Sequence, residues 1–346
     1  MEDGQLAKET ITSFDVAQRA GVSQSAVSRV FSPGASASPV MAEKVKKAAD
    51  ELGYRPNVLA RSLITGSSKM IGLVVAYFDN QFYPEAVEKL SKALQIEGYH
   101  VLVFMASNGD DIDKLTQDLL DYQVDGIVLA SVAVSSTLAA RCDAAGVPVV
   151  LFNRKQNDDQ FSYVTSANYE GGRKVAQFLI AGKHERIAYI AGWEGASTQR
   201  DREAGFRDEL NKAGIELFAR GVGNFQFDET QNATRKMFEA DVIPDAVFVT
   251  NDHMAIAVME CLRDEFKLKI PEDVSIIGYD DVEIASWPSF ALTTIRQPAN
   301  QMVQATVNVL MQRIQGETIE PQKIEIESPL MIRKSARIPK DWQSNS

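Results

Sequence analysis

Cysteine and histidine are both scarce in this chain of 346 residues. The only two cysteines, Cys142 and Cys261, lie in different segments, and no Cys-x-x-Cys pair occurs. This excludes a disulfide framework and a cysteine-based zinc site, and it indicates buried or free thiols in a reducing compartment. The three histidines are scattered and form no metal-binding set. We therefore expect no metal ion and no cofactor.

Long apolar runs are absent as well. No run reaches the roughly 20 residues that a membrane-spanning helix requires, and residues 1–10 are polar, unlike a signal peptide. We expect a cytoplasmic protein without a membrane partner and with a disordered tail at residues 1–10. The composition, 45% hydrophobic and 24% charged, is that of an ordinary soluble protein long enough for two or three domains.

Positive charge is deficient overall, with 36 Lys and Arg against 47 Asp and Glu, and a net charge of −11. The deficit is not uniform. Residues 12–69 carry eight basic and four acidic side chains, so they sum to +4 and leave −15 for the rest. Because affinity for phosphate follows the local field, this segment is a candidate for nucleic-acid binding despite the acidic total.

Residues 14–31 have the pattern of two short helices joined by a sharp turn. Ala17 is small enough for the second helix to pack across the first, and Gly21 follows where a positive φ is expected. Ser23 is expected to cap the second helix. Apolar residues recur at helical spacing on both sides of the turn: Val16, Ala20, Val22, Val27 and Val30. The arrangement is typical of a helix-turn-helix.

The exposed face of the predicted second helix is polar. It presents Ser23, Gln24, Ser25, Ser28 and Arg29. In a helix-turn-helix such a face lies in the major groove of DNA, so we predict that these residues bind DNA. The alternative is a helical hairpin that only packs a core. The agreement of the apolar spacing, the cap and the polar face favours DNA binding.

A third helix is predicted over residues 40–52, with Gly53 ending it. We assign residues 11–56 to a helix-turn-helix domain and residues 57–69 to a hinge helix and linker. The hinge helix is short, and ordering seven residues costs roughly 7–14 kcal/mol of backbone entropy. We therefore expect residues 57–63 to become helical only against DNA.

From residue 70 onward, short apolar runs alternate with amphipathic stretches. Continuous apolar strands that alternate with helices predict parallel sheets covered on both faces. Ligands of such sheets bind beyond the carboxyl ends of the strands, so polar residues just after each strand are candidate site residues. Expected strands are 71–76, 100–105, 126–130, 147–152, 186–191, 246–249 and 275–278. Expected helices are 85–97, 112–122, 171–181, 202–213 and 254–266.

Motifs in a fixed order carry a resemblance to a known family. In the N-terminal segment they are Asp15-Val16-Ala17, Gly21-Val22-Ser23, Val27-Ser28-Arg29-Val30 and Gly53-Tyr54-Arg55-Pro56-Asn57. Further along they are Asn168-x-x-Gly171-Gly172, Arg202-x-x-Gly205-Phe206, Thr250-Asn251-Asp252, Gly278-Tyr279-Asp280-Asp281, Leu292-Thr293-Thr294-Ile295 and Arg333-x-Ser335. From about Ile11 to Ile338 the chain resembles the LacI/GalR family of bacterial transcription regulators.

The resemblance implies a fold. An all-α helix-turn-helix DNA-binding domain is followed by an α/β core like that of periplasmic binding proteins, with two doubly wound subdomains. Three crossovers near Ser166, Pro298 and Ser328 would join the subdomains. The effector-binding core then spans residues 70–338, with a tail at 339–346. Subdomain one comprises about 70–166 plus 299–328, and subdomain two comprises about 167–298 plus 329–338.

The resemblance also implies a function. The expected protein is a sequence-specific transcriptional regulator, and in particular a repressor, of a carbohydrate or sugar-acid pathway. It would bind a pseudo-palindromic operator as a homodimer, and a small-molecule effector would switch its affinity. The alternative is a nucleobase-responsive or other metabolite-responsive regulator with the effector as co-repressor. The C-terminal tail lacks leucine heptads, which argues against a coiled-coil tetramer.

The DNA contacts follow from the same resemblance. The residues expected to read bases are Gln24, Ser25 and Arg29. Arg29 would favour guanine through a bidentate contact. Leu63 matches the hinge leucine that wedges into the minor groove at the operator centre; its alternative is an exposed linker leucine. Asn57 and Arg61 complete the DNA contacts expected from the hinge.

An effector site is implied as well. Arg202 matches the main ligand-binding arginine of the family, whose guanidinium suits vicinal hydroxyls or a carboxylate, and it is expected to open a helix. Asp280 matches the residue that accepts from sugar hydroxyls, and Asn251 offers a donor and an acceptor. Phe225 would cover a sugar ring. From the other subdomain come Asn80, Phe82, Tyr83, Asn153 and Arg154.

These residues also have structural alternatives. Asp280 and Asp281 can cap a loop, and Asn251 with Asp252 can start a helix as an N-cap pair. The ligand class stays open too. The cluster of Arg154, Arg200 and Arg202 suggests an anionic ligand such as a sugar acid, but a neutral sugar is nearly as well supported.

Two other classes of function are weaker. A sugar-pathway enzyme finds its best support in Asp280 and Asp281, but paired catalytic carboxylates must converge from separated positions. No HExxH, GxSxG or phosphate-binding Gly-Lys-Ser motif is present. A transport-binding protein would need a signal peptide and would lack a DNA-binding head. We therefore expect neither an enzyme nor a transport-binding protein.

Overall fold

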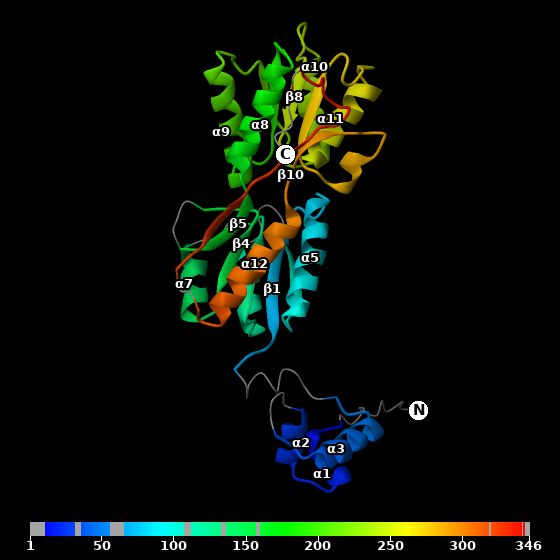
Figure 1. The fold of residues 1–346 in the computed structure, drawn as a ribbon, viewed down its shortest axis with the longest axis vertical. Coiled ribbons are helices and arrows are strands. Elements are labelled where there is room, and N and C mark those ends of the chain that lie inside the picture. Colours follow the sequence, from blue (N-terminus) through cyan, green and yellow to red (C-terminus); the bar gives the residue numbers. More distant parts are fainter. Residues whose placement is uncertain are drawn as a thin grey trace, which may run out of the picture. The chain divides into compact units, whose positions relative to one another are not determined.

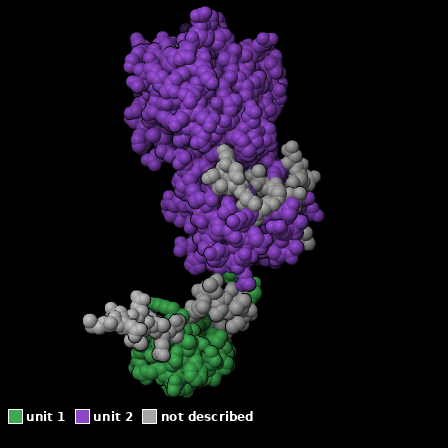
Figure 2. Space-filling model, turned by 180° about the vertical axis from the view of Figure 1, so that it is seen from behind, with its two compact units in different colours: residues 1–68 green, residues 69–346 purple. Residues whose placement is uncertain are grey.

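The computed structural model describes residues 11–31, 36–55, 66–106, 112–132, 136–156, 160–317, 320–340 and 342. The chain divides into two compact units, residues 1–68 and residues 69–346 (Figure 2). The predicted tail at residues 1–10 lies outside the described residues. Among the helices that are described, none combines the length and apolar character needed to cross a membrane.

The described part of the first unit contains three helices (Figure 1). They are α1 (Ser13–Ala20), α2 (Gln24–Phe31) and α3 (Pro39–Leu52), and each packs on the other two. All five apolar residues predicted for the helix-turn-helix lie in or against their shared core, where Val16 and Val27 are fully buried. The predicted helix-turn-helix fold is confirmed.

Local sequence determines where these helices begin and end. Thr12 and Asp15 form a capping box at the start of α1: the Asp15 N–H donates to Thr12 Oγ1 (3.5 Å) and the Thr12 N–H to Asp15 Oδ2 (2.8 Å). Gly21 follows α1 with φ of 68°, as predicted, and Gly53 follows α3 with φ of 69°. Glycine adopts this left-handed conformation without steric cost, so both helices stop sharply.

The described residues of the second unit form two six-stranded sheets (Figure 1). The first has the strand order β11-β5-β4-β3-β1-β2, and every pair is parallel. Its strands are β1 (Met70–Ala76), β2 (His100–Ala106), β3 (Gly126–Ala130), β4 (Val149–Phe152), β5 (Ser162–Ser166) and β11 (Lys323–Ile326). Its helices are α5 (Phe82–Ile96), α6 (Ile112–Asp121), α7 (Ser136–Ala144) and α12 (Ala299–Ile314). Helix α12 packs on α5, β4 and β5.

The second sheet has the order β12-β10-β9-β8-β6-β7 and is parallel except for the antiparallel pair β10 and β12. Its strands are β6 (Ile187–Ala191), β7 (Ala219–Val222), β8 (Ala246–Val249), β9 (Ser275–Asp280), β10 (Thr293–Arg296) and β12 (Leu330–Met331). Its helices are α8 (Asn168–Ala181), α9 (Ser197–Lys212), α10 (Phe227–Phe238), α11 (Asp252–Asp264) and the 3-10 helix Glu283–Ser286. The predicted fold class, with two parallel-sheet subdomains, is confirmed.

The chain passes between the two sheets three times. It leaves the first sheet after β5, returns between β10 and α12, and leaves it again between β11 and β12. A buried polar contact joins two of these passages, because Ser166 Oγ lies 3.0 Å from Gln297 Oε1 and donates to it. The carboxyl ends of the strands in both sheets therefore meet where the chain crosses over.

Candidate DNA-binding surface and effector pocket

Helix α2 presents the residues predicted to bind DNA to solvent. Ser23, Gln24, Ser25, Ser28 and Arg29 are all exposed. Ser23 acts as the expected cap, since its Oγ accepts from the N–H of Ala26 at 3.2 Å. The other predicted DNA contacts, Asn57, Arg61 and Leu63, lie outside the described residues.

Two of the exposed side chains on α2 are already held in place. Gln24 Nε2 donates to Ser13 Oγ on α1 at 2.9 Å, which leaves its Oε1 as an acceptor at the surface. Arg29 Nε donates to the carbonyl of Ser25 at 3.4 Å, a long contact that binding to a base can replace. The surface is thus polar, exposed and partly ordered, as direct reading of base edges requires.

A narrow cavity of about 10 Å³ lies at the carboxyl ends of strands from both sheets. Seven of the nine residues predicted to bind the effector line it: Asn80, Tyr83, Asn153, Arg202, Phe225, Asn251 and Asp280. Three further lining residues, Tyr77, Ser131 and Thr198, were not predicted. Tyr77 and Ser131 follow β1 and β3, so the rule that polar residues after strands form the site would have found them.

Backbone strain concentrates at this cavity. Five of its ten lining residues have positive φ: Tyr77 (59°), Ser131 (62°), Asn153 (54°), Phe225 (62°) and Asp280 (128°). A positive φ is uncommon for residues other than glycine. Strain of this kind persists where the fold holds a side chain in a functional position, so it supports the cavity as a candidate site.

Arg202 is the most constrained side chain of the cavity. Its Nε donates to Asn168 Oδ1 (2.8 Å), its Nη1 to the carbonyl of Thr250 (2.6 Å), and its Nη2 lies 3.5 Å from Asp280 Oδ1. The guanidinium also stacks on Tyr279, with Cζ 3.6 Å from the ring centre. These contacts fix the donor direction before any ligand arrives.

Two glycines explain why Arg202 lies so deep. A Cβ on Gly172 of α8 would come within 2.1 Å of the Arg202 carbonyl oxygen, and a Cβ on Gly205 would come within 1.9 Å of the Tyr169 carbonyl oxygen. Helices α8 and α9 therefore pack backbone to backbone. The expectation that Arg202 opens its helix is wrong, because α9 begins at Ser197 and Arg202 lies in its second turn.

Asp280 connects the two subdomains within the cavity. Its Oδ2 accepts from Asn80 Nδ2 of the other subdomain at 3.0 Å, and its Oδ1 accepts from Gln297 Nε2 at 2.7 Å. Burial raises the pKa of Asp280, although the charge of Arg202 opposes that rise. Gln297 was not predicted; it follows β10 and positions the carboxylate.

Asp252 lies fully buried beneath Asp280. Its Oδ1 accepts from Thr294 Oγ1 (2.6 Å) and its Oδ2 from the Val282 N–H (3.0 Å). Burial, and next the nearby charge of Asp280, raise the pKa of Asp252 to about 8. Burial therefore favours the neutral, protonated form of this group.

The structural alternatives for the acidic and amide pairs hold in part. Asn251 caps α11, since Met254 N donates to its Oδ1 at 3.0 Å, and it also lines the cavity. Asp281 forms ion pairs with Arg296 and Arg333 and does not line the cavity. The two members of each pair therefore have different roles.

Two predicted effector residues do not line the cavity. Phe82 is buried against Tyr83 and Phe152, with ring centres 5.4 and 6.2 Å away. Arg154 is 3% exposed, and its Nη2 donates to the carbonyl and the hydroxyl of Ser131, both at 2.7 Å. Phe82 supports the wall from behind, while Arg154 lies directly behind Ser131.

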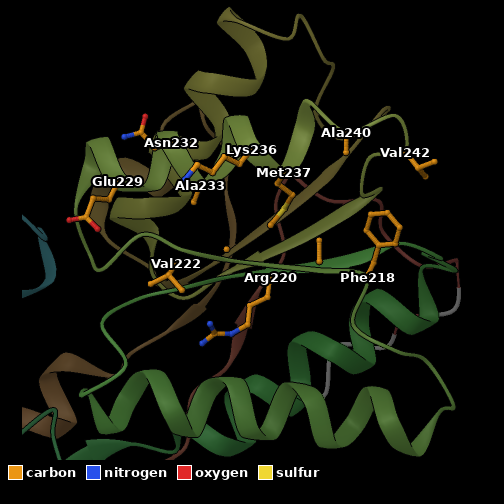
Figure 3. Close-up of a pocket in the computed structure, with 12 residues that line it drawn as sticks. Phe218, Arg220, Val222, Glu229, Asn232, Ala233, Lys236, Met237, Ala240 and Val242 are labelled. Atoms are coloured by element: carbon orange, nitrogen blue, oxygen red, sulfur yellow. The ribbon is translucent and has the colours of Figure 1, made fainter.

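A second hollow lies between the edge strand β7 and α10 (Figure 3). Figure 3 shows Phe218 and Val242 at one end, Glu229 and Asn232 at the other, and Met237 between them. None of the predicted effector residues lines it. It is formed on one subdomain and lacks the convergence of strand ends seen in the first cavity, so it is the weaker candidate for the effector.

Comparisons with known proteins agree with this arrangement. The family model for bacterial regulatory proteins of the lacI family matches residues 12–57, and a periplasmic binding protein-like domain matches residues 176–336. The HTH-type transcriptional regulator CelR of Thermobifida fusca is 36% identical over 329 residues, which cover 92% of this chain and 96% of that protein. The chain belongs to the lacI family.

Further lacI-family relatives cover the same length. The ribose operon repressor of Escherichia coli (strain K12) is 33% identical over 332 residues, 94% of this chain and 99% of that protein. The structure of the Lac repressor dimer bound to operator and the anti-inducer ONPF has a TM-score of 0.85 at 28% identity, covering 94% of this chain and 99% of that chain. The predicted DNA-binding transcriptional regulator is confirmed, and these relatives are regulators rather than enzymes.

Proposed function

We propose that this lacI-family regulator binds a pseudo-palindromic operator as a homodimer, and that a carbohydrate or sugar acid in the cavity of the core switches its affinity. The observation that carries the proposal is the cavity itself, in which Arg202, Asp280 and Asn251 of one subdomain face Asn80 and Asn153 of the other. A ligand held by both sets stabilises one relative position of the subdomains.

The chemistry of the lining supports a hydroxylated ligand. Guanidinium, carboxylate and amide groups offer donors and acceptors in one small space, as sugar hydroxyls require. Phe225 and Tyr77 pack edge to face, with ring centres 5.1 Å apart, and supply the apolar surface for a ring. Gly192 makes room for Phe225, since a Cβ there would come within 2.0 Å of its ring.

Two observations support the proposed dimer: a related structure and one exposed surface of this chain. The related Lac repressor structure is a dimer on operator. In this chain β2 is an edge strand, and it leaves Val103 and Met105 45% and 50% exposed. Apolar residues on an edge strand favour association. We further propose that the protein acts in the cytoplasm, where operator DNA is its partner, and that it acts by binding without turnover.

The test joins ligand binding to operator release. Purified protein is screened by thermal shift against neutral sugars, sugar acids, polyols and nucleobases, and each hit is added to an operator complex. We expect a hit to change operator affinity roughly 5–150-fold, the range of typical allosteric coupling. Weaker binding identifies an inducer and tighter binding a co-repressor.

Arg202→Ala is the decisive variant, because it removes the central donors of the cavity. We expect it to abolish the thermal shift while the protein still binds operator. Arg207→Ala is the matched control: Arg207 lies on the same helix, is 40% exposed in its side chain and pairs with Glu203. A hit that raises the melting temperature of Arg202→Ala and Arg207→Ala equally would mean that the ligand binds outside the cavity. A nucleobase as the active hit would mean that the effector is a nucleobase and not a carbohydrate.

A further inference from the structure

Arg154 is a buried cation whose hydrogen-bonding capacity is only partly used. Within the part of the chain that the structure describes, its Nε and Nη1 are buried and have no hydrogen-bond partner. The groups that its Nη2 contacts, the carbonyl and hydroxyl of Ser131, carry no charge. Trp193 lies with its ring centre 5.9 Å from Cζ, at the outer limit of a cation–π contact.

This cation lies directly behind the wall of the effector cavity. Ser131, which it contacts, and Asn153, which precedes it, both line the cavity. The hydroxyls of Tyr83 and Tyr77, two more lining residues, are close enough to act on its charge. Asn153 Oδ1 is also buried without a partner among the described residues. An unused acceptor therefore lies in the cavity wall, and unused donors lie directly behind it.

The charges around the cavity do not balance. Arg154 and Arg202 are both positive, whereas Asp280 is the one carboxylate among the ten lining residues. Asp280 is also engaged by Arg202, Asn80 and Gln297. Burial raises the pKa of the neighbouring Asp252, which disfavours a second negative charge there. Among the described residues, the hydroxyls of Tyr83 and Tyr77 favour the charge of Arg154, whereas Arg200 and Arg202 repel it.

A buried guanidinium without a compensating charge is costly to the folded state. Such a group is retained where function needs it. We propose that the effector carries a carboxylate, and that Arg154 binds it through the nitrogens that are unpaired in the described residues. This inference rests on the proposed function and narrows it to a sugar acid. The hydroxyl groups of the ligand would then use Arg202, Asp280 and Asn153.

The test compares matched pairs of neutral and acidic sugars by calorimetry and thermal shift. The probes are D-glucose with D-gluconate and D-glucuronate, and D-galactose with D-galactonate and D-galacturonate. Wild type should bind an acid roughly 10–100-fold more tightly than its neutral partner, as expected for hydrogen bonds to a charged group. Neutral sugars that bind as tightly as their acids would overturn the proposal.

The variant Arg154→Met distinguishes direct contact with the ligand carboxylate from the general electrostatic field of the cavity. It should remove the preference for the acid, whereas Arg200→Gln, which changes net charge equally beside the cavity, should keep it. Arg200 is suited as the control because it is exposed and donates to the carbonyls of Glu194 and Gly195. A preference that survives in Arg154→Met would overturn the proposal.

A ligand-free measurement covers the case in which no probe binds. If Arg154 is held for a ligand, Arg154→Met should melt at the same temperature as wild type or higher, because it removes an uncompensated buried charge. A fall in melting temperature would show a structural role and overturn the proposal. Operator binding, measured in parallel, distinguishes failure of this inference from failure of the proposed function. A protein that binds operator and responds to a neutral sugar has the proposed function, and only the inference of a carboxylate on the effector is then wrong.

Discussion

The DNA-binding surface and the effector cavity use similar side chains in opposite ways. On α2, serine, glutamine and arginine side chains are exposed, and water satisfies whatever the neighbouring residues do not. In the cavity, asparagine, aspartate and arginine side chains are almost fully buried and bonded to one another. A substitution on the DNA-binding surface therefore changes the free energy of unfolding little when no DNA is bound. The effector cavity is coupled to the stability of the core, so its residues affect folding and binding together.

The largest effect that this contrast predicts is at Gly205, beneath the cavity. Gly205→Ala forces a Cβ against the Tyr169 carbonyl oxygen, and α8 and α9 must separate. We expect the free energy of unfolding to fall by more than about 3 kcal/mol, with loss of effector binding. Denaturant titration followed by circular dichroism measures it.

Gly214→Ala, just after the end of α9, is the matched control for Gly205→Ala. Its φ is 71° and no atom lies within 4 Å of the place that an added Cβ would occupy, so only the backbone penalty of about 1–2 kcal/mol applies. Equal losses in the two variants would show that close helix packing does not determine the position of Arg202.

The next effect concerns pH and Asp252. Because its folded pKa is raised to about 8 from an ordinary value near 3.8, the folded state binds a proton that the unfolded state releases. Its contribution to stability is therefore fully present at low pH and is lost as pH rises from about 4 to 8. Exposed residues of α2 predict no such slope.

Asp252→Asn should flatten this slope. The amide can keep its contacts to Val282 N and to Thr294, whose hydroxyl can turn to accept. Melting temperatures of both proteins between pH 5 and pH 8 provide the measurement. A wild-type slope that the substitution leaves unchanged would assign the titration to another group.

The smallest effect on folding is expected at Arg29. Arg29→Ala should leave the melting temperature unchanged, but it should weaken specific operator binding by about 1–3 kcal/mol and relax preference at one base pair. Arg19→Ala is the control, since Arg19 is also exposed on the first unit and pairs with Glu51. Binding to wild-type and single-substituted operators measures both, and equal losses on every sequence would mean that Arg29 contacts only phosphate.

Sequence reasoning was most successful where one physical rule dominates. The seven expected strands are all present, with bounds within two residues, because each is a continuous apolar run. Strands β5, β7, β10, β11 and β12 were missed. Strands β7 and β11 are edge strands, where burial does not enforce an apolar sequence, and β12 is only two residues long. Strands β5 (Ser162–Ser166) and β10 (Thr293–Arg296) are interior, but their serine, threonine and arginine residues interrupt the apolar run.

The same limit applies to the cavity. Residues with distinctive chemistry, such as Arg202 and Asp280, could be assigned from motifs, but Gln297 could not. Gln297 directly follows β10, but β10 was not among the expected strands, so the rule for polar residues after strands could not be applied to it. The orientation of Arg154 toward Ser131 likewise results from packing, which becomes visible only in three dimensions.

The threefold passage between the sheets has a consequence for dissecting this protein. Neither half of the core is one continuous piece of chain, because α12 and β11 of the first sheet follow β10 of the second, and β12 of the second sheet follows them. A truncation before residue 299 removes α12 and an edge strand from a subdomain that begins at residue 70. The two halves therefore cannot be made separately as simple fragments, and a library of deletions will report on both at once.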